Sequence, residues 1–319
     1  MSERTPMSSI DNVASKDSES LVEHKENTNV HSLSFPSGHP ILLEDIDIAD
    51  LPVAQLYEMN QRHLEDSIPT EQPLMSKPAP LSALKEEYAN SPSFLAQIDE
   101  LSRQGFNSII RTRGDGDCFY RSLAFAYIDR LIRSNDREIA VATALSTLEL
   151  GRSLLERANF DEIVYDLPYD VLVDLIKRIV SDSDRLTSDG LLKAFQDLEG
   201  TQTPQYIVMY LRLLTSAQIR TEPDEFVAFI MNPDTGMEID VKEFCELFVD
   251  PMGKEADHVP IVALSRALQV HVKIPYLDGR RSDGKVESVE FNHDPSPSDQ
   301  PLSLLYRSDS HSSTHGSHR

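Results

Sequence analysis

A glycine-rich acidic turn leads straight into an apolar helix in the stretch Arg113-Gly114-Asp115-Gly116-Asp117-Cys118-Phe119-Tyr120-Arg121-Ser122. Ahead of this turn, residues 107–112 are apolar in the middle and partly β-branched, which predicts a strand or an extended segment. Behind it, Leu123, Tyr127 and Leu131 recur every four residues and predict a helix with one apolar face. Cys118 is therefore expected at or near the first turn of a helix that packs against a core.

This position favours a reactive thiol at Cys118. The free N–H groups of a helix's first turn carry partial positive charge, which stabilises a thiolate and lowers the cysteine pKa. The same N–H groups can receive the oxyanion of an acyl-transfer intermediate, with Gly116 allowing close backbone approach. Cys245, the second cysteine, lies in an amphipathic helical run without a glycine turn, and we interpret it as a packing residue.

The motif also carries a family resemblance. The string 115–121 resembles the Asp-Gly-Asn-Cys-Phe-Tyr-Arg signature of the ovarian-tumour (OTU) class of deubiquitinating cysteine proteases. Further blocks resemble its otubain subfamily, in order, at 210–216, 241–245, 251–252, 255–258 and 304–307. The resemblance covers roughly residues 81–307 and implies the papain-like OTU fold.

The resemblance implies roles for the residues of the turn. Cys118 matches the nucleophile, and Asp115 matches an aspartate that organises the oxyanion-hole turn and is counted with the active site. Asp115 also suits an ordinary turn or helix cap, which aspartate often provides. Gly116 and Asp117 complete the turn. Asp117 stands where the family commonly has asparagine, and a carboxylate that pointed at the thiol would raise its pKa.

The histidine of the site is the main departure from the family pattern. A cysteine nucleophile needs a base, usually an imidazole. The family's histidine follows the last strand in a Tyr-Arg-Pro-Gly-His-Tyr-Asp context, whereas this chain reads Tyr306-Arg307-Ser308-Asp309-Ser310-His311. Position for position, Ser310 takes the histidine's place and His311 comes one residue late, so His311 is the local candidate. His258 fits a structural, substrate-adjacent block, His271 a strand surface, and His293 a loop.

The patterning predicts an α+β fold with a helical body around a small twisted sheet. Residues 136–270 are expected to be nearly all helix, with Thr203 as a cap and Pro204 in the first turn of one helix. Strands are predicted at 270–274, 286–291 and 302–307. We predict a disordered acidic N-terminal region at 1–76, an otubain-like catalytic domain at 77–308 and an unstructured tail at 309–319. Residues 41–57 form an apolar and acidic island that can fold onto a partner or remain a solvated tail.

Composition excludes several functions. The formal net charge of −23 argues against nucleic acid and anionic membranes as partners, since both would repel the chain. Two cysteines in 319 residues provide no disulfide framework, and neither a signal peptide nor a membrane span is visible. We expect a cytoplasmic or nuclear location. No pattern predicts a cofactor, and the tail histidines have no scaffold for a metal.

Two functions remain open. The resemblance implies a thiol isopeptidase that removes ubiquitin from lysine side chains, with a preference for the polyubiquitin chains that mark proteins for degradation. It also allows a catalytically impaired protein that binds ubiquitin, or a ubiquitin-charged conjugating enzyme, and cleaves weakly because the histidine context is missing.

Overall fold

A computed structural model of the chain describes residues 73–197, 200, 202–233, 235–281, 283–291 and 300–307. The predicted island at 41–57, His293 and the tail with His311 lie outside these residues. The described residues belong to one structural unit, Gln61–Arg319.

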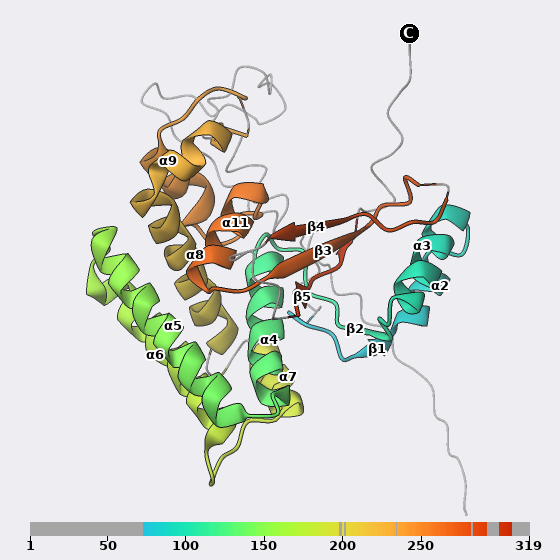
Figure 1. The fold of residues 1–319 in the computed structure, drawn as a ribbon, viewed down its shortest axis with the longest axis horizontal. Coiled ribbons are helices and arrows are strands. Elements are labelled where there is room, and N and C mark those ends of the chain that lie inside the picture. The colour runs from blue at the N-terminus through green and yellow to red at the C-terminus, as the bar shows by residue number, and fades with distance from the viewer. Residues whose placement is uncertain are drawn as a thin grey trace, which may run out of the picture. The chain divides into compact units, whose positions relative to one another are not determined.

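Helices make up most of this unit (Figure 1). The α-helices are α2 (Leu84–Glu87), α3 (Pro92–Arg103), α4 (Cys118–Arg133), α5 (Arg137–Arg157), α6 (Glu162–Lys177), α7 (Ser188–Gln196), α8 (Thr203–Thr221), α9 (Pro223–Phe226), α10 (Val241–Phe244) and α11 (His258–Ala267). Short 3₁₀ turns are η3 (Leu81–Ala83), η4 (Arg178–Val180) and η5 (Val227–Phe229), and a π-helical turn, η6 (Cys245–Val249), follows α10. Residues 136–270, predicted to be nearly all helix, are mostly helical, with non-helical segments that include 181–187, 230–233, 235–240 and 250–257.

Helix α8 is the central helix of the core. Its residues are buried nearly all round, and α4, α5, α6, α7 and α11 all contact it. A helix buried on all sides lies in the protein interior, and its buried polar residues, Arg212 among them, need hydrogen-bond partners there. The predicted cap was wrong: Gln202 takes the cap position in a left-handed conformation (φ 50°), and Thr203 is the first helical residue. Pro204 lies in the first turn as predicted.

The helix behind the cysteine motif also forms as predicted. The side chains of Leu123, Tyr127 and Leu131 on α4 are all buried in the main core. This burial holds the N-terminal end of α4, and with it Cys118, against the rest of the fold.

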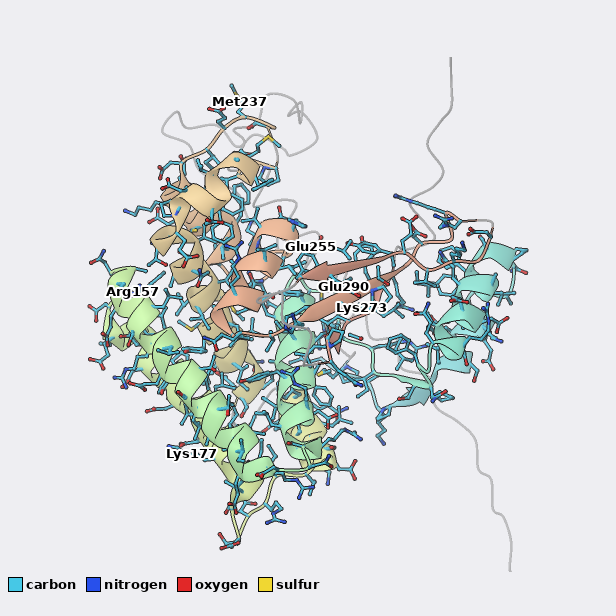
Figure 2. All side chains as sticks on the ribbon, viewed as in Figure 1. Arg157, Lys177, Met237, Glu255, Lys273 and Glu290 are labelled. Carbon is cyan, nitrogen blue, oxygen red and sulfur yellow. The ribbon has the colours of Figure 1, made fainter. Side chains whose placement is uncertain are left out.

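Strand β3 (Val272–Leu277) forms the centre of the sheet. β4 (Ser288–Phe291) pairs with it antiparallel, while β5 (Leu302–Ser303) and β6 (Tyr306–Arg307) pair with it parallel. On the β4 side, Lys273 and Glu290 face each other at 3.4 Å (Figure 2). The sheet contacts α11 through β4 and α3 through β3 (Figure 1). The α+β prediction, with a sheet built largely from C-terminal strands, is confirmed.

The strands differ from the prediction in two ways, and Pro275 explains the second. The strand predicted at 270–274 continues through Pro275 to Leu277, and the one predicted at 302–307 is split into β5 and β6. The N–H of Tyr276 donates to Glu287 O on the β4 side, and Lys273 O accepts from Leu304 on the opposite side. The backbone N–H and C=O groups of successive strand residues point to opposite edges of the strand. The backbone nitrogen of Pro275 therefore faces β5 and β6, and because proline has no N–H, the hydrogen-bond ladder is interrupted there.

The packed part of the chain begins before the predicted boundary at Lys77. Leu74 and Met75 are 4% and 2% exposed. Leu74 O accepts from Arg113 N at 2.9 Å, and Gln196 donates to Met75 O at 2.8 Å. The chain then forms a two-stranded ribbon from β1 (Ala79–Pro80) and β2 (Ser108–Ile109), and β2 falls within the predicted extended segment. Among the described helices, none is both long and apolar enough to cross a bilayer.

Candidate active site

Cys118 is the first residue of α4 and is half-buried. Gly116 has a φ of +79°, a conformation that costs glycine little, and Asp117 occupies the cap position without capping through its side chain. Within the described residues, the backbone N–H groups of Gly116 and Cys118 have no hydrogen-bond acceptor. The turn thus presents N–H donors beside a thiol, as the sequence predicts.

Asp115 is held by an arginine rather than acting as a helix cap. Arg121 donates to both carboxylate oxygens of Asp115, from Nη1 to Oδ1 at 3.1 Å and from Nη2 to Oδ2 at 2.7 Å. The same Oδ1 accepts from the N–H of Asp117 at 3.2 Å. Arg121 is buried on α4, one turn after Cys118. Asp115 therefore ties the turn to the helix that carries the nucleophile.

The carboxylate of Asp117 forms a buried ion pair with Arg212 of α8. The distance from Arg212 Nη2 to Asp117 Oδ1 is 2.5 Å, and Nε donates to the same oxygen at 2.9 Å. The N–H of Gly253 donates to that oxygen as well, at 2.9 Å. The sequence raised the concern that Asp117 points at the thiol; instead its charge is directed to Arg212.

The pKa of the Cys118 thiol is raised from its ordinary value. Burial is the largest cause, followed by the charges of Glu255 and Asp115, while Arg121 and the Phe119 N–H act in the opposite direction. Glu255 lies just ahead of α11 (Figure 2). The lowered pKa predicted from the helix N-terminus was wrong for the described residues, because burial and two carboxylates outweigh the favourable groups. No histidine of the described residues is among the groups that shift the pKa of this thiol.

The described part of the chain holds two histidines, His258 and His271. His258 begins α11 on the surface, with its ring centroid 5.2 Å from that of Phe291. His271 is half-buried, and its carbonyl oxygen accepts from Leu302 N at 2.8 Å. Description of the chain ends at Arg307, so the structure does not test His311 as the base.

Cys245 is a core residue, as interpreted from the sequence. It is fully buried, and its Sγ lies 4.0 Å from Ser216 O. Burial raises the pKa of its thiol to about 11. A protonated, inaccessible thiol is unsuited to nucleophilic attack.

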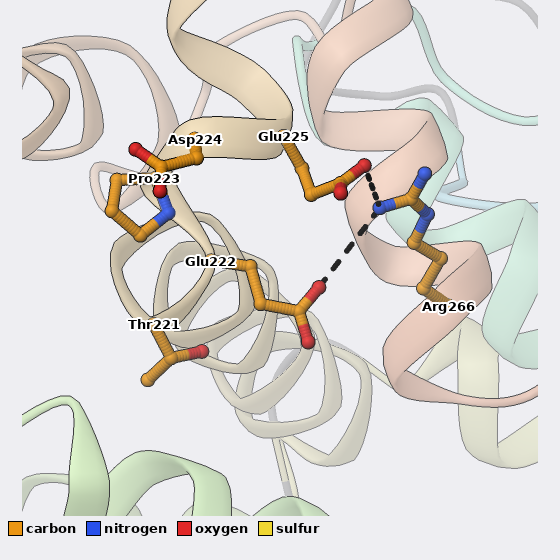
Figure 3. Close-up of a pocket in the computed structure, with 6 residues that line it drawn as sticks. All are labelled: Thr221, Glu222, Pro223, Asp224, Glu225 and Arg266. Carbon is orange, nitrogen blue, oxygen red and sulfur yellow. Dashed lines mark hydrogen bonds and ion pairs between the residues drawn. The ribbon is translucent and has the colours of Figure 1, made fainter.

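A surface depression elsewhere offers no comparable chemistry. It is lined by Thr221, Glu222, Pro223, Asp224, Glu225 and Arg266 (Figure 3). Arg266 lies between two acidic side chains of its own chain, at 3.9 Å from Glu222 and 3.5 Å from Glu225. None of the lining residues belongs to the Cys118 turn or contributes to the pKa of its thiol.

Sequence reasoning missed three residues of the site. Arg212 and Arg121 hold the two aspartates of the turn, and Gly253 contacts the turn through its backbone. A signal for Arg212 was present, because an arginine within the apolar run 206–214 needs a buried partner. Nothing in the sequence indicated which carboxylate that partner is.

An α+β fold with a half-buried cysteine at a helix N-terminus, next to backbone N–H groups that have no acceptor among the described residues, is the arrangement used by thiol peptidases. The family model of the C65 peptidases, the otubains, matches residues 67–311. The chain belongs to this family.

Named relatives agree with this assignment. The chain is 33% identical over 248 residues to the human ubiquitin thioesterase OTUB1, covering 77% of this chain and 84% of that protein. It is 35% identical over 224 residues to the OVARIAN TUMOR DOMAIN-containing deubiquitinating enzyme 1 of Arabidopsis thaliana, covering 69% and 70%.

A solved structure confirms the predicted OTU fold. The complex of h/ceOTUB1 with ubiquitin aldehyde and UBCH5B~Ub contains a similar chain, with a TM-score of 0.66 and 27% identity. The similarity covers 80% of this chain and 94% of that one.

Proposed function

We propose that this protein is a thiol-dependent deubiquitinase that hydrolyses isopeptide bonds at the C-terminus of ubiquitin. The observation that carries the proposal is the Cys118 turn, where a half-buried thiol stands beside the N–H groups of Gly116 and Cys118. Its relatives are ubiquitin thioesterases and deubiquitinating enzymes, which supports the choice of ubiquitin as the substrate.

The proposed reaction uses the Cys118 turn for the nucleophile and the oxyanion, and His311 for proton transfer. Cys118 Sγ adds to the isopeptide carbonyl carbon, and the oxygen takes up the negative charge beside the N–H groups of the turn. Each well-aligned donor of this kind is worth about 3–4 kcal/mol in other acyl-transfer enzymes. His311 accepts the thiol proton and delivers it to the departing lysine amine, which leaves a thioester on Cys118. Water then attacks the thioester, with His311 again as base, and ubiquitin is released.

Degradation-type polyubiquitin is the proposed substrate, and ubiquitin-conjugating enzymes are proposed partners. The solved relatives are complexes of OTUB1 with ubiquitin aldehyde and UBCH5B~Ub or UBC13~Ub, which supports both kinds of partner. The net charge of −23 suits partners with basic surfaces.

Labelling with a ubiquitin that carries an electrophilic C-terminus tests the nucleophile. We expect one label per chain, no label on Cys118→Ala, and full labelling of Cys245→Ala. Undiminished labelling of Cys118→Ala, or loss of the label in Cys245→Ala alone, would refute the assignment.

A second candidate is a protein that binds ubiquitin or a charged conjugating enzyme but cleaves weakly. Two observations favour it: the Cys118 pKa is raised within the described residues, and the family's Pro-Gly-His-Tyr-Asp context is missing after Arg307. An orienting acid and a positioned imidazole each contribute orders of magnitude in rate.

Cleavage of ubiquitin chains by three proteins distinguishes the candidates: the natural chain, His311→Ala, and a chain whose tail after Arg307 is replaced by the family's sequence. If the second candidate holds, the replacement raises the rate by roughly tenfold or more, the scale of a positioned base. If His311 already serves as the base, the natural chain matches the replaced one and His311→Ala abolishes cleavage.

A further inference from the structure

Arg212 contacts three segments of the chain that lie close to the candidate nucleophile Cys118. Its side chain is completely buried on α8. Nη2 donates to Gly116 O at 3.1 Å and to Lys254 O at 2.6 Å, and Nη1 donates to Val249 O at 3.1 Å. Its guanidinium also lies over the ring of Tyr120, 4.3 Å from the centroid. Arg212 thus contacts the turn before Cys118, the helix after it, and both ends of residues 249–254.

Residues 251–254, which we call the Gly253 loop, touch the turn backbone to backbone. A Cβ atom on Gly116 would lie 2.0 Å from Gly253 O, so the two segments approach as closely as glycine allows. Gly253 itself has a φ of +77°, and its N–H donates to Asp117 Oδ1. The loop continues into Glu255, whose charge raises the pKa of the thiol.

These contacts determine the orientation of the peptide units next to Cys118. The peptide between Gly116 and Asp117 is held at both ends, because its oxygen accepts from Arg212 and its N–H donates to Asp115. The next oxygen, of Asp117, accepts from Arg121 N at 3.0 Å within the helix. The C=O of Asp117 and the N–H of Cys118 belong to the same trans peptide and point in opposite directions. Because this C=O points into the helix, the N–H of Cys118 points out of the helix N-terminus.

We propose that Arg212, neutralised by Asp117, is a positioning residue that orients the oxyanion-binding N–H groups beside Cys118. The inference rests on the proposed function, in which those N–H groups stabilise the tetrahedral intermediate. It assigns Asp117 a supporting role, because its carboxylate compensates a buried guanidinium that also holds Gly116 O.

The two possible roles of the Asp117 carboxylate predict opposite effects of Asp117→Asn on turnover. If the carboxylate acted on the thiol as a nearby charge, its removal would lower the Cys118 pKa and raise reactivity. If it supports Arg212, its removal leaves a buried guanidinium without its hydrogen-bonded carboxylate and loosens the turn, so turnover falls.

The matched control is Asp250→Asn. Asp250 pairs with Arg220 at 2.6 Å, two turns further along α8, and both side chains are largely buried. This variant also removes a carboxylate from a buried arginine on α8, and Asp250 acts on Arg212 only as a nearby charge, whereas Asp117 accepts hydrogen bonds from it.

The experiment compares the full-length chain with Asp117→Asn, Arg212→Met, their double variant and Asp250→Asn. The readouts are kcat and KM on a fluorogenic ester of the ubiquitin C-terminus, and the pH profile of Cys118 alkylation by iodoacetamide, all measured where circular dichroism shows folded protein. We expect kcat to fall at least tenfold in both single variants, KM to stay within about threefold, and the alkylation midpoint to stay in place. The double variant should recover thermal stability, since neither charge is left alone, without recovering kcat. Asp250→Asn should keep kcat within about twofold.

Other outcomes overturn the inference. A kcat in Asp117→Asn equal to that of Asp250→Asn, or a higher kcat with a lower alkylation midpoint, refutes the positioning role. If the natural chain itself neither turns over the ester nor reacts with electrophilic ubiquitin, the proposed function fails instead. Amide hydrogen exchange then decides the role of Arg212: Asp117→Asn should accelerate exchange at Gly253 and Asp117, and unchanged protection there refutes it.

Discussion

The contact between the Cys118 turn and the Gly253 loop can be measured by adding one methyl group. In Gly116→Ala the new Cβ would lie 2.0 Å from Gly253 O, whereas in Gly253→Ala the nearest atom is Asp115 O at 3.6 Å. Both glycines have nearly the same backbone conformation, with φ of +79° and +77°. The second variant therefore carries the conformational strain of the first without its steric clash.

The expected losses in the free energy of unfolding follow from the conformational strain and the steric clash. A side chain in the left-handed region costs about 1–2 kcal/mol, which is the expected loss for Gly253→Ala. In Gly116→Ala the loop must also move away by about 1 Å, because a Cβ does not approach closer than about 3 Å. That movement breaks the bond from Gly253 N–H to the Asp117 carboxylate, worth about 1.5–3 kcal/mol. We expect a total loss of roughly 2.5–5 kcal/mol for Gly116→Ala.

Urea unfolding followed by circular dichroism measures both losses, provided that the denaturant slopes agree between the variants. Gly236→Ala gives a baseline for strain alone, since Gly236 has a φ of +68° and no atom within 4 Å of its Cβ position. Equal losses for Gly116→Ala and Gly253→Ala would refute the close approach of the two backbones.

Three further changes test the surroundings of the site. Asp115→Asn should cost roughly 2–3 kcal/mol in urea unfolding, because Arg121 is buried, and should shift the alkylation midpoint of Cys118 to lower pH, because Asp115 raises its pKa; an unshifted midpoint would contradict the electrostatic account. A chain that starts at residue 77 should melt below one that starts at residue 72, because it lacks the buried Leu74 and Met75, and equal melting temperatures would show that these two residues are dispensable. Between pH 9 and 11 the folded chain keeps a proton on Cys245 that the unfolded chain releases, so stability should fall with rising pH by on the order of 2 kcal/mol. Cys245→Ala should remove that part of the pH dependence, and an unchanged slope would show that the thiol does not contribute.

The local sequence around Cys118 was sufficient to predict its backbone setting. A glycine in an acidic turn and a four-residue apolar repeat behind it are both short-range signals, and the structure confirms the helix start at Cys118. The C-terminal sheet was predictable for the same reason, since its strands alternate with period two. The split of the last strand was not, because it depends on which side of β3 Pro275 faces.

The electrostatics of the site depend on contacts that sequence spacing does not reveal. Arg212 lies 95 residues from Asp117, so their ion pair is defined only by the packing of α8 against α4. Glu255 reaches the neighbourhood of the thiol because the Gly253 loop packs on the turn. Burial, the distant Glu255 and the nearby Asp115 raise the pKa of Cys118. The position of Cys118 at the helix start, taken alone, predicted a lowered pKa.

The two halves of the candidate site are therefore built in different ways. The nucleophile's half is held by two arginines within the described fold, and substitutions there should change stability and turnover together. The proposed base, His311, follows Arg307, whose guanidinium pairs with Glu87 at 2.8 Å. Glu87 also pairs with Arg111, which leads into the Cys118 turn, so one carboxylate links the start of the tail to the approach of the nucleophile. Since the tail after Arg307 has no apolar alternation that would bury it in the core, changes in the tail should alter turnover and leave the free energy of unfolding unchanged. In a chain of this kind, loss of activity need not be accompanied by loss of fold.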